Sequence, residues 1–358
     1  MKLTVTVLML LAAAAAGCHR TEALRHYGTG YLAYEKGELD DALREFEAAT
    51  QLDHTLAVAY VSKGDVLREQ GQLEQAIRPY QAAIRLAPFE YAYHYRLGRV
   101  YQALDRDKDA AQTYEQAVDL NPDYAPAWIN LGVVYFRLGD LAMARTDCEK
   151  AVGLVPDHGY AWSNLGAVYD ALGDPYRAIT AYQKSLELDP NQAPVHVNLG
   201  TAYLRQGRLD KALEEFKLAS SLDPNSAVVR KRLASVYCKQ KKYGAAIEQL
   251  QAALAMDPKD SECRNSLAAI YMIFYLRHPA TDRLRQAAIE QWHESLQANP
   301  DQPEIKQLIA RWAKPLPVPE PEAGGPLPPE IEAVLPPSKD KAARGPAPEV
   351  DPKAAPEP

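Results

Sequence analysis

Three asparagines recur at equal spacing along the chain, at Asn130, Asn164 and Asn198. A side-chain amide both donates and accepts hydrogen bonds. A row of amides at a regular spacing can therefore hold the backbone of an extended polypeptide with little regard to its sequence. This chemistry is binding rather than catalysis. The asparagines indicate a surface for an extended peptide, provided that the fold places them on one face.

The other reactive side chains form no recognisable catalytic or metal-binding set. The eight histidines include no HExxH pair, and Cys148, Cys238 and Cys263 lack the CxxC spacing of a zinc site or redox motif. The stretch 28–33 matches a loose nucleotide-binding fingerprint, but no strand precedes it. We therefore expect a protein that is not an enzyme and that needs no cofactor or metal. A net charge of −7 also argues against a nucleic-acid partner.

Charge is distributed unevenly along the chain. Residues 23–90 carry 7 basic and 11 acidic side chains, whereas residues 227–285 carry 11 basic and 5 acidic ones. Lys231, Arg232 and Lys239 lie in the basic part, and Arg205 precedes it. Such a cluster favours an acidic segment or a C-terminal carboxylate as partner. A basic surface that is merely solvated is an equally simple interpretation.

The leader 1–17, MKLTVTVLMLLAAAAAG, has the form of an export signal with one early lysine and a long apolar stretch. The apolar part would cover roughly 21 Å as a helix, less than a hydrocarbon core of about 30 Å. With Cys18 the leader resembles a bacterial lipobox, which implies lipidation of Cys18, a short linker over 18–22 and attachment to a membrane. Because His19 follows, the resemblance implies the outer membrane, facing the periplasm. A secreted or inner-membrane-anchored protein is the alternative.

A repeat of constant period, counted from Ala23, fills the middle of the chain. Its eighth position is glycine in six successive copies: Gly30, Gly64, Gly98, Gly132, Gly166 and Gly200. Its twenty-fourth position is usually aromatic: Phe46, Tyr80, Tyr114, Tyr182 and Phe216, with Cys148 as an exception. Small residues at fixed positions let two helix backbones approach closely, while apolar residues at helical spacing fill the seam. The repeat therefore predicts an all-α fold with two antiparallel helices per copy.

Glycine and proline mark the ends of these helices. Glycine stands near position 15 in five copies, where a positive φ would end the first helix: Gly37, Gly71, Gly139, Gly173 and Gly207. Proline at position 32 ends the second helix from the second copy on.

The segments Ala127–Gly132 and Leu188–Pro190, with their counterparts in the other copies, resemble the tetratricopeptide repeat family. The resemblance implies a right-handed α-solenoid of about eight hairpins over residues 23–300, starting at residues 23, 57, 91, 125, 159, 193, 227 and 261. The last copy carries an eight-residue insertion within 275–285. A capping helix is expected over 301–313. Residues 314–358 contain 14 prolines and a net charge of −3, and we expect them to be disordered.

In this family the first helices line a concave groove, which carries over to specific positions here. The resemblance places the asparagines in the groove, with apolar and basic side chains around them: Ile129, Val133, Phe136, Tyr160, Val197, Leu204, Arg205, Lys231, Arg232 and Lys239. Exposed apolar clusters mark interaction sites. Two simpler interpretations stay open. Asparagine is common at its position in the family, and tight coiling could bury some of the apolar residues.

These observations favour a non-catalytic interaction scaffold, anchored to the bacterial envelope, that binds a protein or extended peptide in its groove. By resemblance, the machines served include pilus or secretin assembly, outer-membrane protein assembly and peptidoglycan enzymes. A structural spacer or oligomerising adaptor that uses its convex face or its tail is the alternative. The sequence does not specify an oligomeric state.

Overall fold

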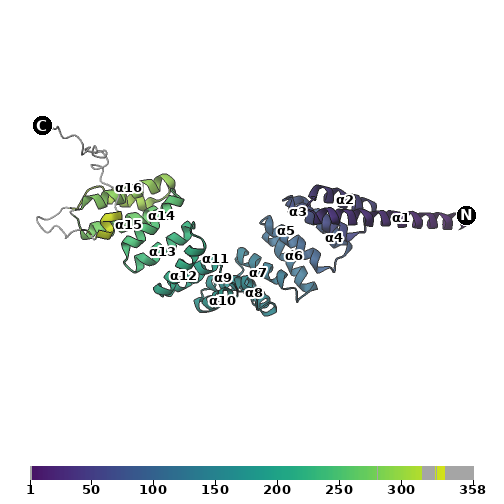
Figure 1. Cartoon of the computed structure of the whole chain (residues 1–358), viewed down its shortest axis with the longest axis horizontal. Helices are drawn as coiled ribbons and strands as arrows, with labels where there is room; N and C mark the ends of the chain where they lie inside the picture. The colour runs from purple at the N-terminus through teal and green to yellow at the C-terminus, as the bar shows by residue number, and fades with distance from the viewer. Residues whose placement is uncertain (1, 280, 317–326, 328, 335–358) are drawn as a thin grey trace, which may run out of the picture. The chain divides into compact units, whose positions relative to one another are not determined.

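The computed structural model describes residues 2–279, 281–316, 327 and 329–334, and all regular structure in this part of the chain is helical (Figure 1). The all-α class predicted from the repeat is therefore confirmed. The chain divides into two compact units, Met1–Pro190 and Asn191–Pro358. Within the described residues no helix is both long enough and apolar enough to cross a membrane.

The first unit is a series of helical hairpins in which each odd-numbered helix packs against the next helix. Its helices are α1 (Lys2–Glu35), α2 (Leu39–Leu52), α3 (Ala57–Glu69), α4 (Leu73–Leu86), α5 (Tyr91–Ala103), α6 (Asp107–Leu120), α7 (Ala125–Leu138), α8 (Leu141–Leu154), α9 (Gly159–Ala171) and α10 (Pro175–Leu188). From α3 on, the first helix of each hairpin begins at the same interval after the previous one. This interval is the period of the sequence repeat.

The second unit continues the hairpins and adds two short helices. Its helices are α11 (Ala193–Arg205), α12 (Leu209–Leu222), α13 (Ala227–Lys239), α14 (Tyr243–Met256), α15 (Ser261–Arg277), α16 (Asp282–Ala298), α17 (Pro303–Arg311) and α18 (Pro329–Val334). Helix α17 lies where a capping helix is expected, and its apolar residues Ile305, Leu308 and Ile309 pack against the core of this unit.

Helix α1 departs from the sequence expectation at its start. We expected a linker over residues 18–22, but α1 runs without a break from Lys2 to Glu35. The physical reason is that residues 18–27 contain no proline or glycine, so nothing in this stretch ends a helix once it has begun.

The turns inside the hairpins follow the glycine pattern. All five predicted glycines have φ between 72° and 81°: Gly37, Gly71, Gly139, Gly173 and Gly207. In the third and seventh repeats Asp105 (φ 56°) and Lys241 (φ 60°) occupy the same left-handed conformation. A residue with a Cβ atom adopts this conformation at some energetic cost. The turn geometry is therefore the same between the hairpins even where the glycine is absent.

In five of the hairpins an aromatic ring of the second helix lies against a glycine of the first helix. A Cβ atom added to Gly98 would lie 2.6 Å from the ring of Tyr114, and one added to Gly64 would lie 2.8 Å from that of Tyr80. Tyr80 and Tyr114 are fully buried. The glycine at position 8 and the aromatic residue at position 24 are thus the two halves of one contact between the helices of a hairpin.

The eight-residue insertion lengthens the last hairpin. Helices α15 and α16 each contain 17 residues, whereas α13 contains 13 and α14 contains 14. The added residues form a socket for the chain that follows α17. Arg285 donates hydrogen bonds to the carbonyl oxygens of Trp312 (2.7 Å) and Ala313 (3.1 Å). Tyr275 accepts one from the backbone N–H of Leu316 (2.7 Å).

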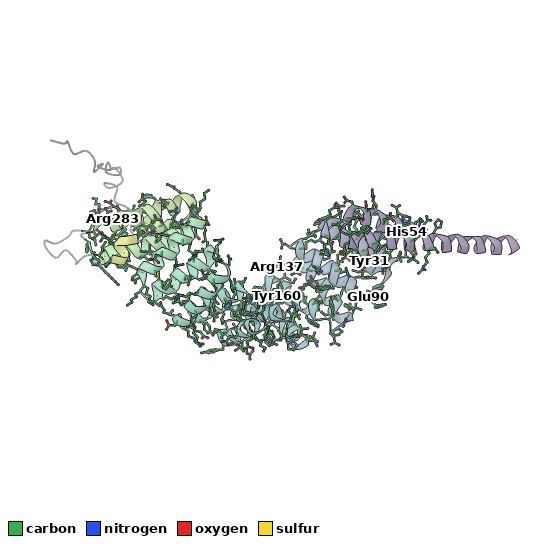
Figure 2. All side chains as sticks on the ribbon, in the orientation of Figure 1. Tyr31, His54, Glu90, Arg137, Tyr160 and Arg283 are labelled. Carbon is green, nitrogen blue, oxygen red and sulfur yellow. The ribbon has the colours of Figure 1, made fainter. Side chains whose placement is uncertain are left out.

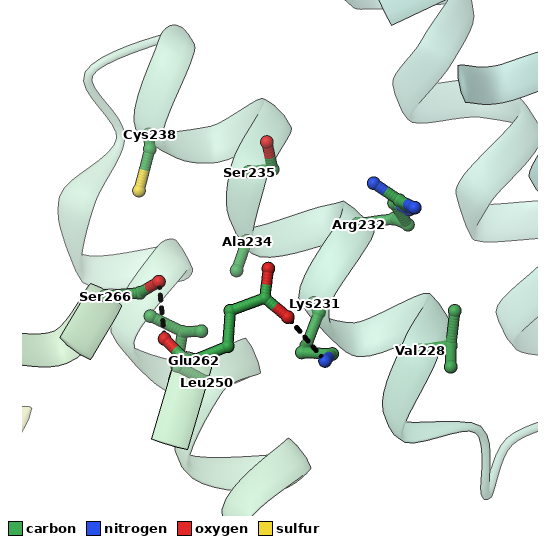
Figure 3. Close-up of a pocket in the computed structure, with 9 residues that line it drawn as sticks. All are labelled: Val228, Lys231, Arg232, Ala234, Ser235, Cys238, Leu250, Glu262 and Ser266. Carbon is green, nitrogen blue, oxygen red and sulfur yellow. Dashed lines mark hydrogen bonds and ion pairs between the residues drawn. The ribbon is translucent and has the colours of Figure 1, made fainter. Parts of the chain in front are cut away.

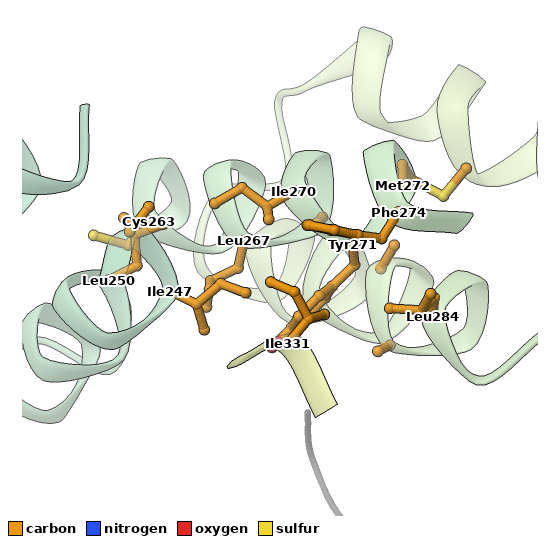
Figure 4. Packing of buried hydrophobic residues seen from close by; sticks show 14 of the residues in the cluster. Ile247, Leu250, Cys263, Leu267, Ile270, Tyr271, Met272, Phe274, Leu284 and Ile331 are labelled. Atoms are coloured by element: carbon orange, nitrogen blue, oxygen red, sulfur yellow. The ribbon is translucent and has the colours of Figure 1, made fainter. Parts of the chain in front are cut away.

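The proline-rich segment is not wholly unstructured. We expected disorder over 314–358, but Pro329–Val334 form helix α18, which packs on α14. Ile331 is fully buried among Ile247, Tyr271 and Leu284 (Figure 4). Pro329 presets φ at the first helical position, and burial of Ile331 offsets the cost of ordering this short helix. Residues 317–326, 328 and 335–358 lie outside the described part of the segment.

Candidate functional site

The asparagines of the first unit do not form equivalent contacts. Asn130 on α7 donates its Nδ2 hydrogen to the hydroxyl of Tyr114 (3.2 Å), so part of its amide is used inside the fold. Nδ2 of Asn164 on α9 is buried and has no hydrogen-bond partner among the described residues. A buried amide donor without a partner is costly. The two side chains therefore do not present one continuous row of free amides.

The apolar residues predicted for the groove lie in different environments. Ile129 is only 7% exposed and belongs to the core between α7, α8 and α9, which corrects its placement in the groove. It is buried because apolar residues of α8 and α9 pack together with it in one cluster. Val133 is half-buried, whereas Phe136 is exposed. Tyr160, labelled in Figure 2, is exposed as well. Of this set, Phe136 and Tyr160 are the ones most accessible to a partner.

In the second unit, the predicted residues on α11 lie at least partly at the surface. Asn198 and Arg205 are exposed, and Val197 and Leu204 are half-buried. On α13, Arg232 and Lys239 are exposed and form no ion pair among the described residues. These residues could contact a partner of this unit.

Lys231 is the exception among the predicted basic residues. It lines a cleft of about 440 Å³ between α13 and α15, but its Nζ lies 2.8 Å from a carboxylate oxygen of Glu262 (Figure 3). The same Nζ lies 3.0 Å from a carboxylate oxygen of Asp260. The hydrogen bond to Glu262 and the one to Asp260 raise the pKa of Lys231 above its usual range. Asp260 is the N-cap residue of α15 and Glu262 lies in its first turn, so both carboxylates stand at the start of the next hairpin and offset the charge of Lys231. Lys231 is therefore already ion-paired, and its role as a contact for an acidic partner stays a prediction.

A second cleft, in the first unit, was not selected from the sequence. It has a volume of about 410 Å³ and is lined by residues of α1, α3 and α5, the first helices of three successive hairpins. Four of the lining residues are tyrosines: Tyr27, Tyr31, Tyr34 and Tyr93. We call it the tyrosine cleft. Tyr31, labelled in Figure 2, is 48% exposed. Val58, on the neighbouring helix α3, is 40% exposed.

A signal for this cleft is present in the sequence. Tyr27, Tyr31 and Tyr34 follow one another at i, i+4 and i+7, so they share one face of α1. With Ala23 as position 1, they stand at positions 5, 9 and 12. These tyrosines were not selected from the sequence, because the asparagine and basic residues directed the selection toward later repeats.

The walls of the tyrosine cleft are held by a polar network. Asp65 accepts a hydrogen bond from the hydroxyl of Tyr80 (2.6 Å) and forms an ion pair with Arg96. Tyr34 donates its hydroxyl to Glu69, and burial together with this bond raises the pKa of Tyr34 to about 12. The Asp65–Arg96 and Tyr34–Glu69 contacts join consecutive hairpins, and the Tyr80–Asp65 bond joins the two helices of one hairpin, so together they fix the side walls of the cleft.

The exposed edge of the tyrosine cleft carries one carboxylate that these contacts leave accessible. Glu35, near the C-terminal end of α1, is exposed. A hydrogen bond with Glu35 raises the pKa of the Tyr31 hydroxyl. The edge therefore presents an aromatic ring beside a negative charge.

A metal site and a reactive thiol each place requirements on the cysteines and potential metal ligands of the described residues. The described residues contain no group of three histidine, cysteine or acidic side chains that could hold a metal ion. Burial raises the pKa of Cys148 and of Cys263 to about 12, so both thiols stay protonated at neutral pH. What the molecule offers a partner is surface: open clefts along the first helices of its hairpins.

Tandem helical hairpins with clefts along their first helices define a helical-repeat protein of the binding type. Family models described as tetratricopeptide repeat match residues 27–125, 123–191 and 171–270, together about two thirds of the chain. The chain belongs to the tetratricopeptide repeat family. Proteins of this family act as scaffolds for protein–protein interaction and are typically not catalysts.

Solved structures with the same fold come from unrelated settings. The Cut9–Hcn1 hetero-tetramer of the APC/C contains a chain that aligns with a TM-score of 0.54 at 20% identity, covering 77% of this chain and 53% of that one. This chain thus spans about half the length of that relative. The Pseudomonas aeruginosa protein pilF aligns with a TM-score of 0.52 at 20% identity, covering 63% and 98%.

A tetratricopeptide repeat protein from Parabacteroides merdae aligns with a TM-score of 0.53 at 16% identity, covering 70% of this chain and 99% of that one. At such identities the likeness concerns the fold. No curated protein matches the chain.

Proposed function

We propose that the protein is a scaffold that binds an extended segment of a protein partner in the tyrosine cleft. The observation that supports this most directly is the stripe of tyrosines on α1, open to solvent and flanked by α3 and α5. Tyrosine rings supply a large apolar contact area together with a hydroxyl that can hydrogen-bond to a peptide backbone. An exposed aromatic surface of this kind on a family of binding scaffolds favours recognition of a polypeptide.

Truncation of Tyr31 tests this function. We expect peptides selected from a random dodecapeptide library on the wild-type protein to bind Tyr31→Ala at least tenfold more weakly. The reason is that removing an aromatic anchor from the centre of an interface costs about 1–2 kcal/mol or more. Affinity would be measured by isothermal titration. Because Tyr31 is about half exposed, the circular dichroism of the variant should match that of the wild type.

Tyr176→Ala is the matched control. Tyr176 is 76% exposed on α10 and does not line the tyrosine cleft. Its truncation should leave the affinity for the selected peptides unchanged. If no selected peptide distinguishes Tyr31→Ala from Tyr176→Ala, the tyrosine cleft is not the binding site.

We also propose that Cys18 carries lipid and holds the protein on the bacterial envelope, with the outer membrane as its site. The support is the leader 1–17, which is followed directly by a lipobox-like cysteine. Several acyl chains would give nearly permanent attachment, since each buried methylene contributes about 0.8 kcal/mol.

The anchor is tested by Cys18→Ala with the natural leader retained. In a bacterial host we expect the wild-type chain to incorporate labelled palmitate and to sediment with membranes. Cys18→Ala should lose the label and shift to the soluble fraction. Cys238→Ala, which replaces a half-buried cysteine of α13, is the control and should keep both properties. Equal labelling of the wild type and Cys18→Ala would contradict lipidation at this residue.

Among envelope machines, pilus or secretin assembly is the one that we propose to examine first. The support is the combination of a lipoprotein leader with a tetratricopeptide array, which resembles pilotins, and pilF shares the fold. The neighbouring genes give the simplest check. A secretin or pilin operon would favour this machine, whereas genes for outer-membrane protein assembly or peptidoglycan hydrolysis would favour those alternatives.

A further inference from the structure

The tyrosine stripe has the length of one turn of a polyproline helix. Tyr27 and Tyr34 are seven residues apart on α1, which corresponds to roughly 10 Å at the α-helical rise. A polyproline II segment rises about 3.1 Å per residue with three residues per turn, so one turn covers roughly 9 Å. Aromatic-lined grooves recognise such segments, because the extended backbone is formed in advance and costs little entropy to bind.

The tyrosine cleft is also suited to a cation. Residues 23–90, which include most of its lining, carry a net charge of −4. The one arginine that lines it, Arg96, is paired with Asp65. Glu35 is exposed beside Tyr31. A lysine or arginine of a partner could therefore pair with Glu35 while lying over the Tyr31 ring, where the ring quadrupole attracts a cation.

The chain itself contains a segment with both properties. Residues 335–348 read LPPSKDKAARGPAP, with four prolines, three basic residues and one acidic residue. Their net charge is +2, whereas the rest of the 314–358 segment carries 2 basic and 7 acidic residues, a net of −5. Residues 335–348 are therefore basic within an otherwise acidic segment, and their charge is opposite to that of the acidic, aromatic cleft.

We propose that residues 335–348 of one copy occupy the tyrosine cleft of a second copy. The inference rests on the proposed function, because it names the partner of the same cleft. The segment begins directly after helix α18, which Ile331 fixes to the second unit (Figure 4). The tyrosine cleft lies on the first unit. Occupation therefore joins the second unit of one copy to the first unit of the next, a head-to-tail contact that can continue from copy to copy.

The first test uses a fluorescent peptide with the sequence of residues 335–348 and the full chain in mild detergent. We expect saturable binding by fluorescence anisotropy that weakens at least tenfold in Tyr31→Ala and remains unchanged in Tyr176→Ala. A peptide with Lys339, Lys341 and Arg344 replaced by glutamate should bind at least tenfold more weakly. Equal binding of the two peptides would overturn the charge complementarity on which the proposal depends.

The second test measures self-association of the full chain by sedimentation velocity over a range of concentrations. We expect the mean mass to rise with concentration and the rise to disappear in the triple variant Lys339→Glu, Lys341→Glu and Arg344→Glu. Lys306→Glu, a charge reversal at an exposed residue of α17, is the control and should associate like the wild type. If the protein stays a monomer at all concentrations but its tyrosine cleft is still closed to the peptide, residues 335–348 occupy the cleft of their own copy. This result would overturn the proposal.

The outcomes also separate this inference from the function on which it rests. If library peptides bind in a Tyr31-dependent way but the 335–348 peptide does not, the tyrosine cleft is a binding site with a different partner. If neither kind of peptide depends on Tyr31, both the partner and the function of the cleft are wrong.

Discussion

Gly98→Ala is expected to destabilise the first unit by about 3 kcal/mol, since overpacking a filled core costs typically 1–3 kcal/mol and occasionally more. The new Cβ atom would lie 2.6 Å from Cε1 and 2.7 Å from Cδ1 of Tyr114. The ring is fully buried and its hydroxyl is held by Gln102 (2.8 Å) and Asn130 (3.2 Å), so it cannot move away without losing these bonds. The denaturant midpoint of the variant measures the effect.

Gly153→Ala is the matched control for this substitution. Gly153 is also inside a helix of the first unit, α8, but no heavy atom lies within 4 Å of a Cβ added there. Its replacement removes the low helix propensity of glycine and should stabilise the protein by about 0.5–1 kcal/mol. Should both alanine variants shift the midpoint by the same amount and in the same direction, the ring contact at Gly98 is not a determinant of stability.

The repeat spacing and the turn glycines show how far the sequence predicts the fold. The constant repeat spacing determines where each hairpin begins, and the glycines with positive φ determine where its first helix ends. Both features are local, since they depend on helical period and on the conformational freedom of single residues. Asp105 and Lys241 show the limit of such rules, because there the packing of the hairpin imposes the left-handed turn on residues that disfavour it.

The candidate site was less predictable, because it depends on contacts between repeats. Lys231 has the position of a groove residue, yet it forms ion pairs with Asp260 and Glu262 at the start of α15. Asn130 has the position of a ligand contact, yet it donates to Tyr114 of the preceding repeat. A position in the repeat predicts the face of a helix. It does not predict which residue of a neighbouring helix forms a hydrogen bond or an ion pair with the side chain on that face.

The C-terminal region illustrates the same limit for folding. Composition predicts that residues 314–358 cannot bury enough apolar surface to order. An average over the composition does not reveal that one residue of the segment can be buried. Ile331 finds a site among residues of α14, α15 and α16, which lie more than forty residues earlier in the chain, and no local signal identifies that site.

Asp147 is a buried carboxylate in the fourth hairpin whose charge the fold disfavours. Its side chain on α8 is 2% exposed, and its Oδ2 has no hydrogen-bond partner among the described residues. Burial first, and then the negative charges of Glu115 and Asp140, raise the pKa of Asp147 to about 7. Tyr135, from α7, donates its hydroxyl to Glu115, so it does not offset the charge of Asp147.

This raised pKa predicts the direction in which stability changes with pH. Below about pH 4 the carboxyl group is protonated in both the folded and the unfolded chain, and it costs nothing. Between about pH 4 and 7 the folded chain retains a proton that the unfolded chain releases, so the free energy of unfolding falls as the pH rises. Above pH 7 the cost is complete, at most about 4 kcal/mol for a shift of about three pKa units.

Asp147→Asn should therefore stabilise the protein by about 2–4 kcal/mol at pH 8 and leave it nearly unchanged at pH 4, since an amide of the same shape cannot ionise. Denaturant midpoints would be measured from pH 4 to pH 8 for the wild type and for Asp147→Asn. The difference between the two midpoints should grow as the pH rises. Asp123→Asn, at an exposed residue of the preceding loop, is the control and should run parallel to the wild type. A parallel course for Asp147→Asn as well would mean that Asp147 stays ionised in the fold, with its charge balanced by contacts that relax around it.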